Sequence, residues 1–225
     1  MKLVSIQVGR PRLVMMAGQS HSTAIFKAPV EGPVMARRHN LDGDRQANLE
    51  VHGGEHNAVY AYPSEHYPSW KSETGRDDLV HGQFGENFTT EGLTEKDVCI
   101  GDRLQIGEAV FEVSQPRIPC ANLALRMQDQ TFPKRFLKSQ RSGYYLRVIE
   151  EGEVRAGDAI EWVARDPAGL SVHAIHTLAF FDRGNAQGIE RALSISTLAP
   201  EWRRMFAKLR DSAVEGHDAP VEPNA

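Results

Sequence analysis

Hydrophobic periodicity changes once along this chain, near residues 166–169 (DPAG), and that change constrains the fold more than any single motif. Before it, short stretches such as 2–8 alternate apolar and polar residues and are separated by glycine and proline. After it, apolar residues recur at helical spacing. Alternation predicts β-strands, and the longer spacing predicts helices. We therefore expect a β-rich domain over residues 1–165, followed by a small three-helix domain over 166–214.

Further elements follow from the same patterns. Strands are also predicted in the following segments: RLVMMA at 12–17, STAIFK at 22–27, AVYAYP at 58–63, VCIGDRLQIG, AVFEVSQ, GYYLRVIEEG and AIEWVAR. So many short, glycine-bounded strands favour a barrel or a sandwich. Two helical patches interrupt them: one that Ser64 can cap, and one over 119–140 that should break at Pro133. In the C-terminal domain, Ser171 can cap the first helix, and Pro200 suits the first turn of the third.

Composition is that of a soluble globular protein. The chain has 225 residues, 40% of them hydrophobic, and a net charge of −4. This charge disfavours non-specific binding to nucleic acid or to an anionic membrane. No apolar run approaches the roughly 20 residues that span a bilayer, and the N-terminal segment lacks the apolar core of a secretory signal. We expect a cytoplasmic protein without membrane contact, and a disordered tail over the polar residues 215–225.

The most pointed chemical signal is the segment SQPRIPC at 114–120. Its prolines should stiffen the loop, and Cys120 stands three residues after Arg117, at the start of a predicted helix. A helix N-terminus and a nearby guanidinium both favour thiolate over thiol. Thiolate is the form that binds a soft metal or attacks an electrophile, although a small buried apolar role is the alternative. Cys99 alternates with apolar residues and is predicted to be a core residue within a strand; two cysteines make no disulfide framework.

The glycine pair Gly53-Gly54, within VHGGEH, is a second candidate. Such a turn lets the backbone approach a ligand closely and can offer amides to a phosphate or a polar heterocycle. His52 beside it could donate a hydrogen bond. A plain hairpin turn and a structural histidine are the alternatives. A zinc site from His52 and His56 is disfavoured, because two glycines oppose the helix that this spacing requires and no third ligand stands out.

Two further polar residues are candidates for ligand binding. Asn87, in FGENFTTEGL, can donate and accept hydrogen bonds, although polar loops of this kind are often only loops. Lys27, at the end of STAIFK, would hold an anion in a cleft and would otherwise be solvated. No serine elbow, Walker loop, HExxH or paired CxxC motif is present. The residues alone therefore indicate a β-rich domain with a reactive cysteine in a rigid loop.

Taken in order, several segments resemble the MOSC domains of the YiiM type, from about Ser22 to Arg165. These segments are LDGDRQ, VHGG, FGENFTTEGL, GDRLQIG, SQPRIPC and GYYLRVIEEGEVRAGD. VHGG and SQPRIPC at this separation are the specific part of the resemblance, and the helical remainder is similar to the three-helix domain that follows MOSC in that group. Two positions depart from the family pattern: Glu55-His56 stands where Pro-Asp is common, and Tyr144 where tryptophan is usual.

The resemblance implies a MOSC-like β-barrel that binds the molybdenum cofactor, a pterin with a dithiolene and a phosphate. Cys120 matches the cysteine that coordinates molybdenum. The other implied cofactor-binding residues are Lys27, His52, Gly53, Gly54, Asn87 and Arg117. We assign Lys27 and Arg117 to the phosphate or to anionic oxygens. Asn87 and the glycine backbone suit the pterin edge.

The family's activity implies reduction of N-hydroxylated compounds, such as N-hydroxylated purine bases and related hydroxylamines. Cys120 and His52 would be the catalytic residues, with His52 carrying protons because its ordinary pKa is about 6.5. No flavin or nicotinamide motif is present, so an external flavoprotein reductase would supply electrons. The main alternative is a sulfur carrier that holds a persulfide on Cys120 and delivers the sulfur to a metal cofactor.

A nucleic-acid module is a third class of function. Three short C-terminal helices can suggest a helix-turn-helix, and arginines are present there. Acidic residues such as Asp182 and Glu201 interleave with them, which is typical of a solvated helix face. We therefore expect no nucleic-acid partner. The sequence leaves the oligomeric state, monomer or homodimer, open.

Overall fold

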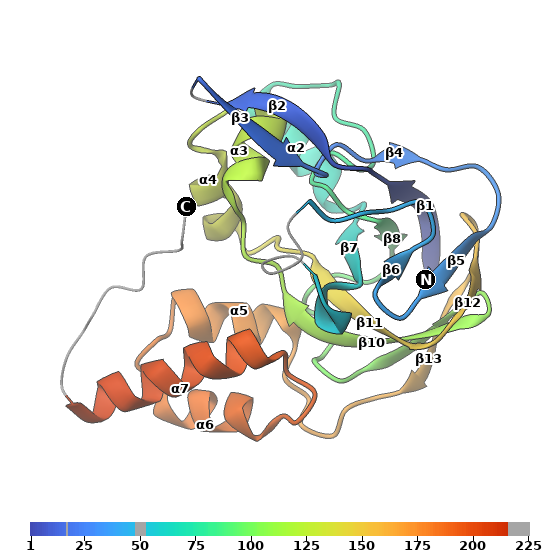
Figure 1. Ribbon diagram of the computed structural model, residues 1–225. Coiled ribbons are helices and arrows are strands. Elements are labelled where there is room, and N and C mark those ends of the chain that lie inside the picture. The colour runs from blue at the N-terminus through green and yellow to red at the C-terminus, as the bar shows by residue number, and fades with distance from the viewer. Residues whose placement is uncertain (17, 48–52, 216–225) are drawn as a thin grey trace.

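The centre of the molecule is one eight-stranded sheet (Figure 1), in a computed structural model that describes residues 1–16, 18–47 and 53–215. Its strands are, in spatial order, β13 (Ile160–Ala164), β9 (Arg103–Ile106), β10 (Ala109–Pro116), β11 (Tyr144–Glu150), β7 (Val59–Pro63), β8 (Phe88–Glu91), β1 (Lys2–Val8) and β4 (Ala28–Pro29). Neighbouring strands are antiparallel, except that β7 and β8 are parallel. The strands predicted at 2–8 and 58–63 correspond to β1 and β7.

The predicted closed barrel is not confirmed, because the strand ladders leave β4 and β13 as the outermost strands. The sheet nevertheless curls. Lys2 forms an isolated bridge with Ala159, and the Leu3 amide donates to the Asp158 carbonyl at 2.9 Å. These contacts tie β1 to the segment that precedes β13. The architecture is therefore mixed α/β around one large curled sheet.

Two smaller sheets flank the large one. They are formed by β12 (Gly152–Val154), β5 (Val34–Arg37) and β6 (Asn40–Leu41), and by the hairpin of β2 (Arg12–Met16) and β3 (Gln19–Thr23). The strand predicted at 22–27 is wrong, since β3 ends at Thr23. The Thr23 hydroxyl accepts from the Ile25 amide at 3.2 Å, and the Lys27 amide donates to the Ile25 carbonyl at 3.0 Å. This local turn uses the backbone groups that a β-strand would pair with a neighbouring strand.

The described residues of the N-terminal part form four short helices: η1 (Glu55–Asn57), α2 (His66–Thr74), α3 (Ala121–Met127) and α4 (Phe132–Ser139). The predicted Ser64 cap is wrong, because Glu65 is the N-cap of α2 and makes no side-chain capping bond. The predicted break at Pro133 is misplaced. The chain turns at Gln128, which has a φ of 55°, and Pro133 lies in the first turn of α4. A proline is tolerated there because a first-turn amide has no helical partner to lose.

The C-terminal part consists of α5 (Val172–Phe180), α6 (Ala186–Ser194) and α7 (Pro200–Glu215). The Ser171 hydroxyl accepts from the Ala174 amide at 3.1 Å, which confirms the predicted cap. Pro200 begins α7, as predicted. The tail predicted to be disordered lies, from residue 216 on, outside the described residues. In the described part of the chain, no helix is long and apolar enough to cross a membrane.

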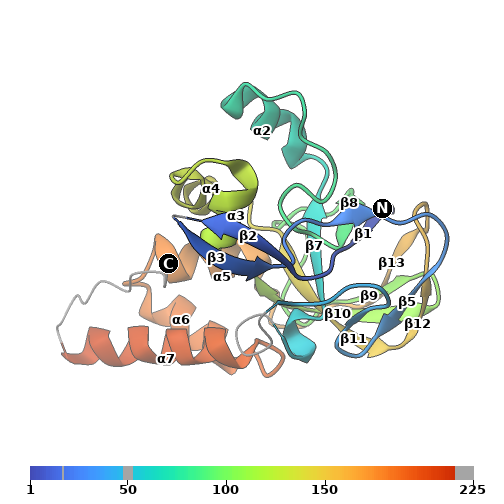
Figure 2. The same ribbon diagram turned by 45° about the horizontal axis from the view of Figure 1, so that its top comes forward.

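One continuous core joins the large sheet to the three C-terminal helices, which group together on one side of the molecule (Figure 2). Phe88 and Phe111 of the sheet share this core with Ile175, Trp202 and Phe206 of the helices, and all five are fully buried. A second, largely aromatic cluster lies between β7, α2, α3 and α4. It includes Tyr60, Tyr62, Tyr67, Trp70, Phe84, Phe132 and Phe136. This second cluster forms the rigid backing of the candidate site.

Candidate functional site

A pocket with about 670 Å³ of empty space, its open mouth included, lies between β3, β7, β11 and the start of α3. The pocket is lined by Thr23, Ala24, Ile25, Lys27, Asp44, Arg45, Gln46, Ala47, Asn57, Tyr60, Gly85, Asn87, Arg117, Ile118, Cys120, Asn122 and Tyr145. Four of the residues predicted to bind a cofactor, Lys27, Asn87, Arg117 and Cys120, therefore lie in one pocket.

Cys120 enters this pocket at the start of α3. It is the N-cap residue, with an extended backbone (φ −126°, ψ 174°), and its carbonyl accepts from the Leu123 amide at 2.9 Å. Its side chain makes no capping hydrogen bond, and the residue is half-buried. Strand β10 ends at Pro116, so the proline-containing loop runs directly from the sheet to this thiol. The predicted placement at a helix N-terminus is confirmed.

Arg117 lies almost completely buried beside the pocket, with 6% of its surface exposed. It donates to the Phe84 carbonyl, and its Cζ lies 4.7 Å from the centroid of the Tyr60 ring. Burial disfavours the charge, but the neighbouring Tyr60, Tyr145 and Cys120 more than offset burial, and the pKa of Arg117 is raised. A permanently charged guanidinium near the thiol favours the thiolate form.

A buried ion pair joins Lys27 to Asp44. The Lys27 Nζ contacts the two Asp44 carboxylate oxygens at 2.6 and 2.7 Å, and the side chains are 9% and 2% exposed. Asp44 also accepts from Asn87 Nδ2 at 3.0 Å, while Asn87 Oδ1 accepts from the Tyr60 amide at 3.1 Å. Burial lowers the pKa of Lys27, and Asp44 opposes that shift. Lys27 and Asn87 thus hold the pocket wall together as well as facing its interior.

The motif FGEN shapes the loop before β8. Glu86 is fully buried and accepts from the amides of Gly82 at 2.7 Å and Phe84 at 3.0 Å. Gly85 has a φ of 81°, and a Cβ there would meet Ile25 Cγ1 at 2.8 Å. Only glycine fits this position without strain. The motif therefore holds the Phe84 carbonyl where the guanidinium binds it.

The glycine pair does not line the pocket. Gly54, with a φ of 91°, leads into η1, and the Gly53 carbonyl accepts from Asn57 Nδ2 at 3.1 Å. The glycine pair is therefore linked to the pocket by this hydrogen bond with Asn57, which is a lining residue. His52, the predicted proton carrier, lies outside the described residues. His56 is not a lining residue, and burial lowers its pKa.

Three pocket residues of LDGDRQ, Asp44, Arg45 and Gln46, were missed by sequence reasoning. Asp44 organises the ion pair described above, and the exposed Arg45 lines the pocket. The available signal was a carboxylate between a glycine and an arginine, beside a predicted ligand-binding turn. Asn122 was also missed; its Oδ1 is hydrogen-bonded to His21 Nε2 at 2.9 Å, which ties β3 to α3. No sequence signal marks that contact.

Tyr145 is a further missed residue. It follows Tyr144 on β11, and strand alternation places the two rings on opposite faces. Tyr144 is fully buried, so the departure from tryptophan at this position lies in the core, whereas Tyr145 lines the pocket. Burial raises the pKa of Tyr145 to about 12. The phenol therefore keeps its proton at neutral pH.

The pocket has a positive charge balance in a chain with a net charge of −4. Among the described residues, its charged lining residues are three cations, Lys27, Arg45 and Arg117, and one anion, Asp44. This balance suits an anionic ligand. Among the residues described, no group of three or more His, Cys, Asp or Glu side chains could hold a metal ion.

Cys99 lies far from this chemistry, at the junction with α5. It is 8% exposed, which confirms the predicted burial, but it forms only an isolated bridge with Ser171 and belongs to no strand. Its amide donates to Asp102 Oδ2 at 2.7 Å. Burial, followed by the charge of Asp102, raises the pKa of the Cys99 thiol.

Two family profiles match the chain, the MOSC domain over residues 48–161 and the YiiM-like 3-alpha helix domain over residues 170–213. The uncharacterized protein YflK of Bacillus subtilis is 40% identical over 209 residues, which cover 93% of this chain and 94% of that protein. YiiM of Escherichia coli is 35% identical over 190 residues, 84% of each chain.

A protein named Reductase from Gibberella moniliformis is 34% identical over 166 residues, which cover 72% of this chain and 29% of that protein. The crystal structure of YiiM from Geobacillus stearothermophilus has a TM-score of 0.79 and 36% identity, covering 93% of this chain and 98% of that one. The chain belongs to the MOSC-domain family, in the group that carries a YiiM-like three-helix domain.

Proposed function

We propose that this protein is a molybdenum-cofactor-dependent reductase of N-hydroxylated compounds, with N-hydroxylated purine bases and related hydroxylamines as substrates. The observation that carries the proposal is the placement of Cys120 in a cationic pocket beside Arg117. A thiolate is the soft ligand that such a metal prefers. The surrounding positive charge both favours the thiolate and attracts the anionic part of the cofactor.

The pocket residues fit this cofactor by their chemistry. Cys120 supplies one protein ligand to the metal. Arg117 and Arg45 suit a phosphate or other anionic oxygens, because a guanidinium can offer two parallel donors. Lys27 can donate fewer hydrogen bonds to such an anion, because its Nζ already donates to both carboxylate oxygens of Asp44. Asn57, which lines the pocket, suits the polar edge of a pterin.

The proposed reaction breaks one N–O bond and consumes two electrons and two protons. The N-hydroxylated substrate leaves as the amine, and its oxygen leaves as water. The cofactor, when bound, supplies the two-electron chemistry. The protein's part is to position the substrate, to limit access of bulk water and to provide hydrogen-bond donors at the leaving oxygen.

Tyr145 is the described residue best suited to that last role. Its phenol is protonated at neutral pH and faces the same pocket as Cys120. The Tyr60 hydroxyl is less suited, because it already donates to the Ser142 carbonyl at 2.8 Å. His52 remains a proposed proton carrier whose position is not described.

Electrons would come from an external flavoprotein. Support for a reductive role comes from the fungal relative named Reductase, which is much longer than this chain. The alternative function is a sulfur carrier, in which the Cys120 thiolate holds a persulfide. The same electropositive surroundings would favour it, so the two functions must be separated by experiment.

The test compares Cys120→Ala with Cys99→Ala, each purified without oxygen from a host that makes the cofactor. Molybdenum and pterin should be near-stoichiometric in the wild type and in Cys99→Ala. Molybdenum content and reduction of an N-hydroxylated purine should be lost in Cys120→Ala. A folded wild type that acquires neither component, but carries an extra sulfur atom on Cys120, would favour the carrier.

A further inference from the structure

Positive charge is concentrated in two segments of this acidic protein. Residues 1–30 contain four lysines and arginines and no acidic residue, and residues 117–141 contain six and a single aspartate. Together they carry a charge of +9 in a chain whose net charge is −4. The hairpin β2–β3, from the first segment, lies beside α3 and α4, from the second, in both views (Figures 1 and 2). Arg12 of the hairpin therefore lies near Arg126 of α3, whereas Lys27 and Arg117 of the two segments are buried at the pocket.

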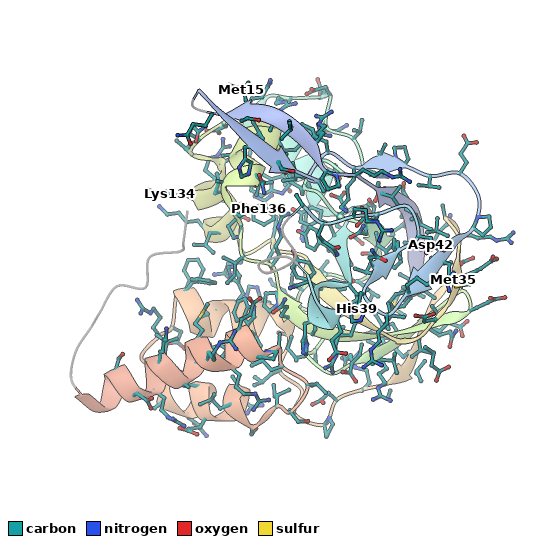
Figure 3. The ribbon with its side chains drawn as sticks, in the orientation of Figure 1. Met15, Met35, His39, Asp42, Lys134 and Phe136 are labelled. Carbon is teal, nitrogen blue, oxygen red and sulfur yellow. The ribbon has the colours of Figure 1, made fainter. Side chains whose placement is uncertain are left out.

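The hairpin exposes two large apolar side chains. Leu13 is 74% exposed and Met15 is 67% exposed. They are two residues apart on β2 and so share one side of the ribbon, and Met15 projects from the outer end of the hairpin (Figure 3). Exposed apolar residues bordered by cations are typical of a surface that meets a partner.

Arginines at the base of the hairpin lack carboxylate partners. Arg10, Arg12 and Arg45 form no ion pair with any described residue. Arg12 instead has its Cζ 3.5 Å from the centroid of the Phe26 ring, and the Arg126 guanidinium lies 5.2 Å from the same ring. Two like charges around one ring, without a carboxylate between them, leave a site that an acidic partner can neutralise.

This face borders the mouth of the pocket. Thr23, the last residue of β3, lines the pocket, as does Arg45. His21 of β3 is hydrogen-bonded to the pocket residue Asn122. A protein that docks on the hairpin therefore comes close to the pocket that contains Cys120.

We propose that Leu13 and Met15, with Arg10, Arg12 and Arg126, form the docking surface for an acidic flavoprotein that delivers electrons to the pocket. The proposal rests on the proposed reductase function for the nature of the partner. Charge complementarity speeds encounter and orients the donor, and the two apolar residues supply the contact. Self-association through this face is disfavoured, since two copies would bring their unpaired arginines together.

The experiment measures binding to a purified small FMN protein with a strongly acidic surface, immobilised and titrated at several salt concentrations. The variants are Arg10→Glu/Arg12→Glu and Leu13→Ser/Met15→Ser. The matched control is Arg204→Glu/Lys208→Glu, which makes the same charge change at two exposed residues of α7 that have no ion-pair partner among the described residues. Circular dichroism verifies that each variant is folded.

We expect either hairpin variant to weaken binding at least about tenfold, and the control to bind like the wild type. The salt dependence of the wild type should be reduced in the arginine variant. Turnover with reduced methyl viologen should be unchanged in all variants. If the wild type shows no such turnover, the reductase function fails, while the binding data still decide the surface.

Three outcomes would overturn the docking proposal. In the first, the hairpin variants bind the FMN protein as tightly as the wild type. In the second, the α7 control loses as much binding as they do. In the third, the hairpin binds vesicles of anionic phospholipid but not the flavoprotein, which would make the face a membrane-contact surface.

Discussion

The pocket and the junction with α5 each contain a cysteine, a buried aspartate and an arginine, but a different charged group lies beside the sulfur in each. In the pocket, Arg117 lies buried near Cys120, while Asp44 is engaged by Lys27. At the junction, Asp102 accepts a hydrogen bond from the Cys99 amide. Burial is the main cause of the raised pKa of the Cys99 thiol, and the charge of Asp102 raises it further. Which charge stands next to the sulfur differs between the regions, although the residue types are the same.

The junction does contain a cation, but it is poorly placed to help a thiolate. Arg165 approaches Cys99 Sγ at 4.0 Å, yet its side chain is 51% exposed and it also contacts Asp102 at 3.3 Å. Its charge is screened by solvent and shared with that carboxylate. Whether a thiol forms a thiolate therefore depends less on the residue types around it than on the burial and pairing of those neighbours.

The largest expected effect is in thiol reactivity. In protein prepared without cofactor, iodoacetamide should alkylate Cys120 at least about a thousandfold faster than Cys99, because only Cys120 lines an open pocket and Cys99 must await local opening. Mass spectrometry of peptides gives both rates from one sample. Because the pKa of Cys99 is raised, its rate should still be climbing with pH above the range of an ordinary thiol. Equal rates would remove the distinction between the two regions.

The second effect concerns the carboxylate that stabilises the pocket. Asp44→Asn leaves the buried Lys27 ammonium without its counter-charge, so we expect a loss of about 3 kcal/mol in the free energy of unfolding. Asp42→Asn is the matched control: its ion pair with Arg37 is about half exposed, so its loss should change the stability far less. Urea denaturation measures both. A similar loss in the two variants would mean that the Asp44 pair has no special structural role.

A third test addresses the junction. His176 is fully buried, both ring nitrogens lack a hydrogen-bond partner among the described residues, and burial lowers its pKa to about 4. The unfolded histidine binds its proton near pH 6.5, so stability is present above that pH and is lost as the pH falls toward 4. At pH 5 the loss should be about 2 kcal/mol.

His176→Leu should abolish that part of the acid sensitivity, since leucine cannot take up a proton. Denaturation midpoints of the two proteins at pH 7 and pH 5 give the difference. If both lose the same stability between these pH values, other groups cause the acid sensitivity, and the buried histidine is not the weak point of the junction.

The order of elements could be predicted from the sequence because periodicity and caps are local. Ser171 and Pro200 marked their helices correctly, and β1 followed from alternation alone. The errors arose where a short-range hydrogen bond competed with the pattern. Strand β3 ends at Thr23, whose hydroxyl accepts a hydrogen bond from the Ile25 amide. The chain turns at Gln128, before it reaches Pro133. The curling of the sheet depends on contacts between β1 and residues near 158, which no local rule describes.

The site could be predicted in part for the same reason. Cys120 and Arg117 are close in sequence, and their chemistry could be read from one loop. Asp44 and Asn122 act through partners that are remote in sequence, Lys27 and His21, so only the folded chain brings each pair together. A segment noted only for family resemblance thus contained the carboxylate that organises the pocket.

The smallest effect separates two neighbouring tyrosines of β11. Tyr145→Phe keeps the ring but removes the phenolic hydroxyl from the pocket, and it should lower the turnover of an N-hydroxylated purine about tenfold, the size expected for the loss of one hydrogen bond. Tyr144→Phe is the matched control, because its hydroxyl lies in the core, where it approaches the Leu93 carbonyl at 3.5 Å.

Molybdenum content should be unchanged in both variants, which separates a role in turnover from a role in cofactor retention. If Tyr145→Phe matches the wild type, another group protonates the leaving oxygen, and His52 becomes the next residue to replace. If Tyr144→Phe loses as much activity as Tyr145→Phe, the effect comes from packing of β11. The pocket-lining hydroxyl of Tyr145 and the core hydroxyl of Tyr144 would then not differ in their effect on turnover.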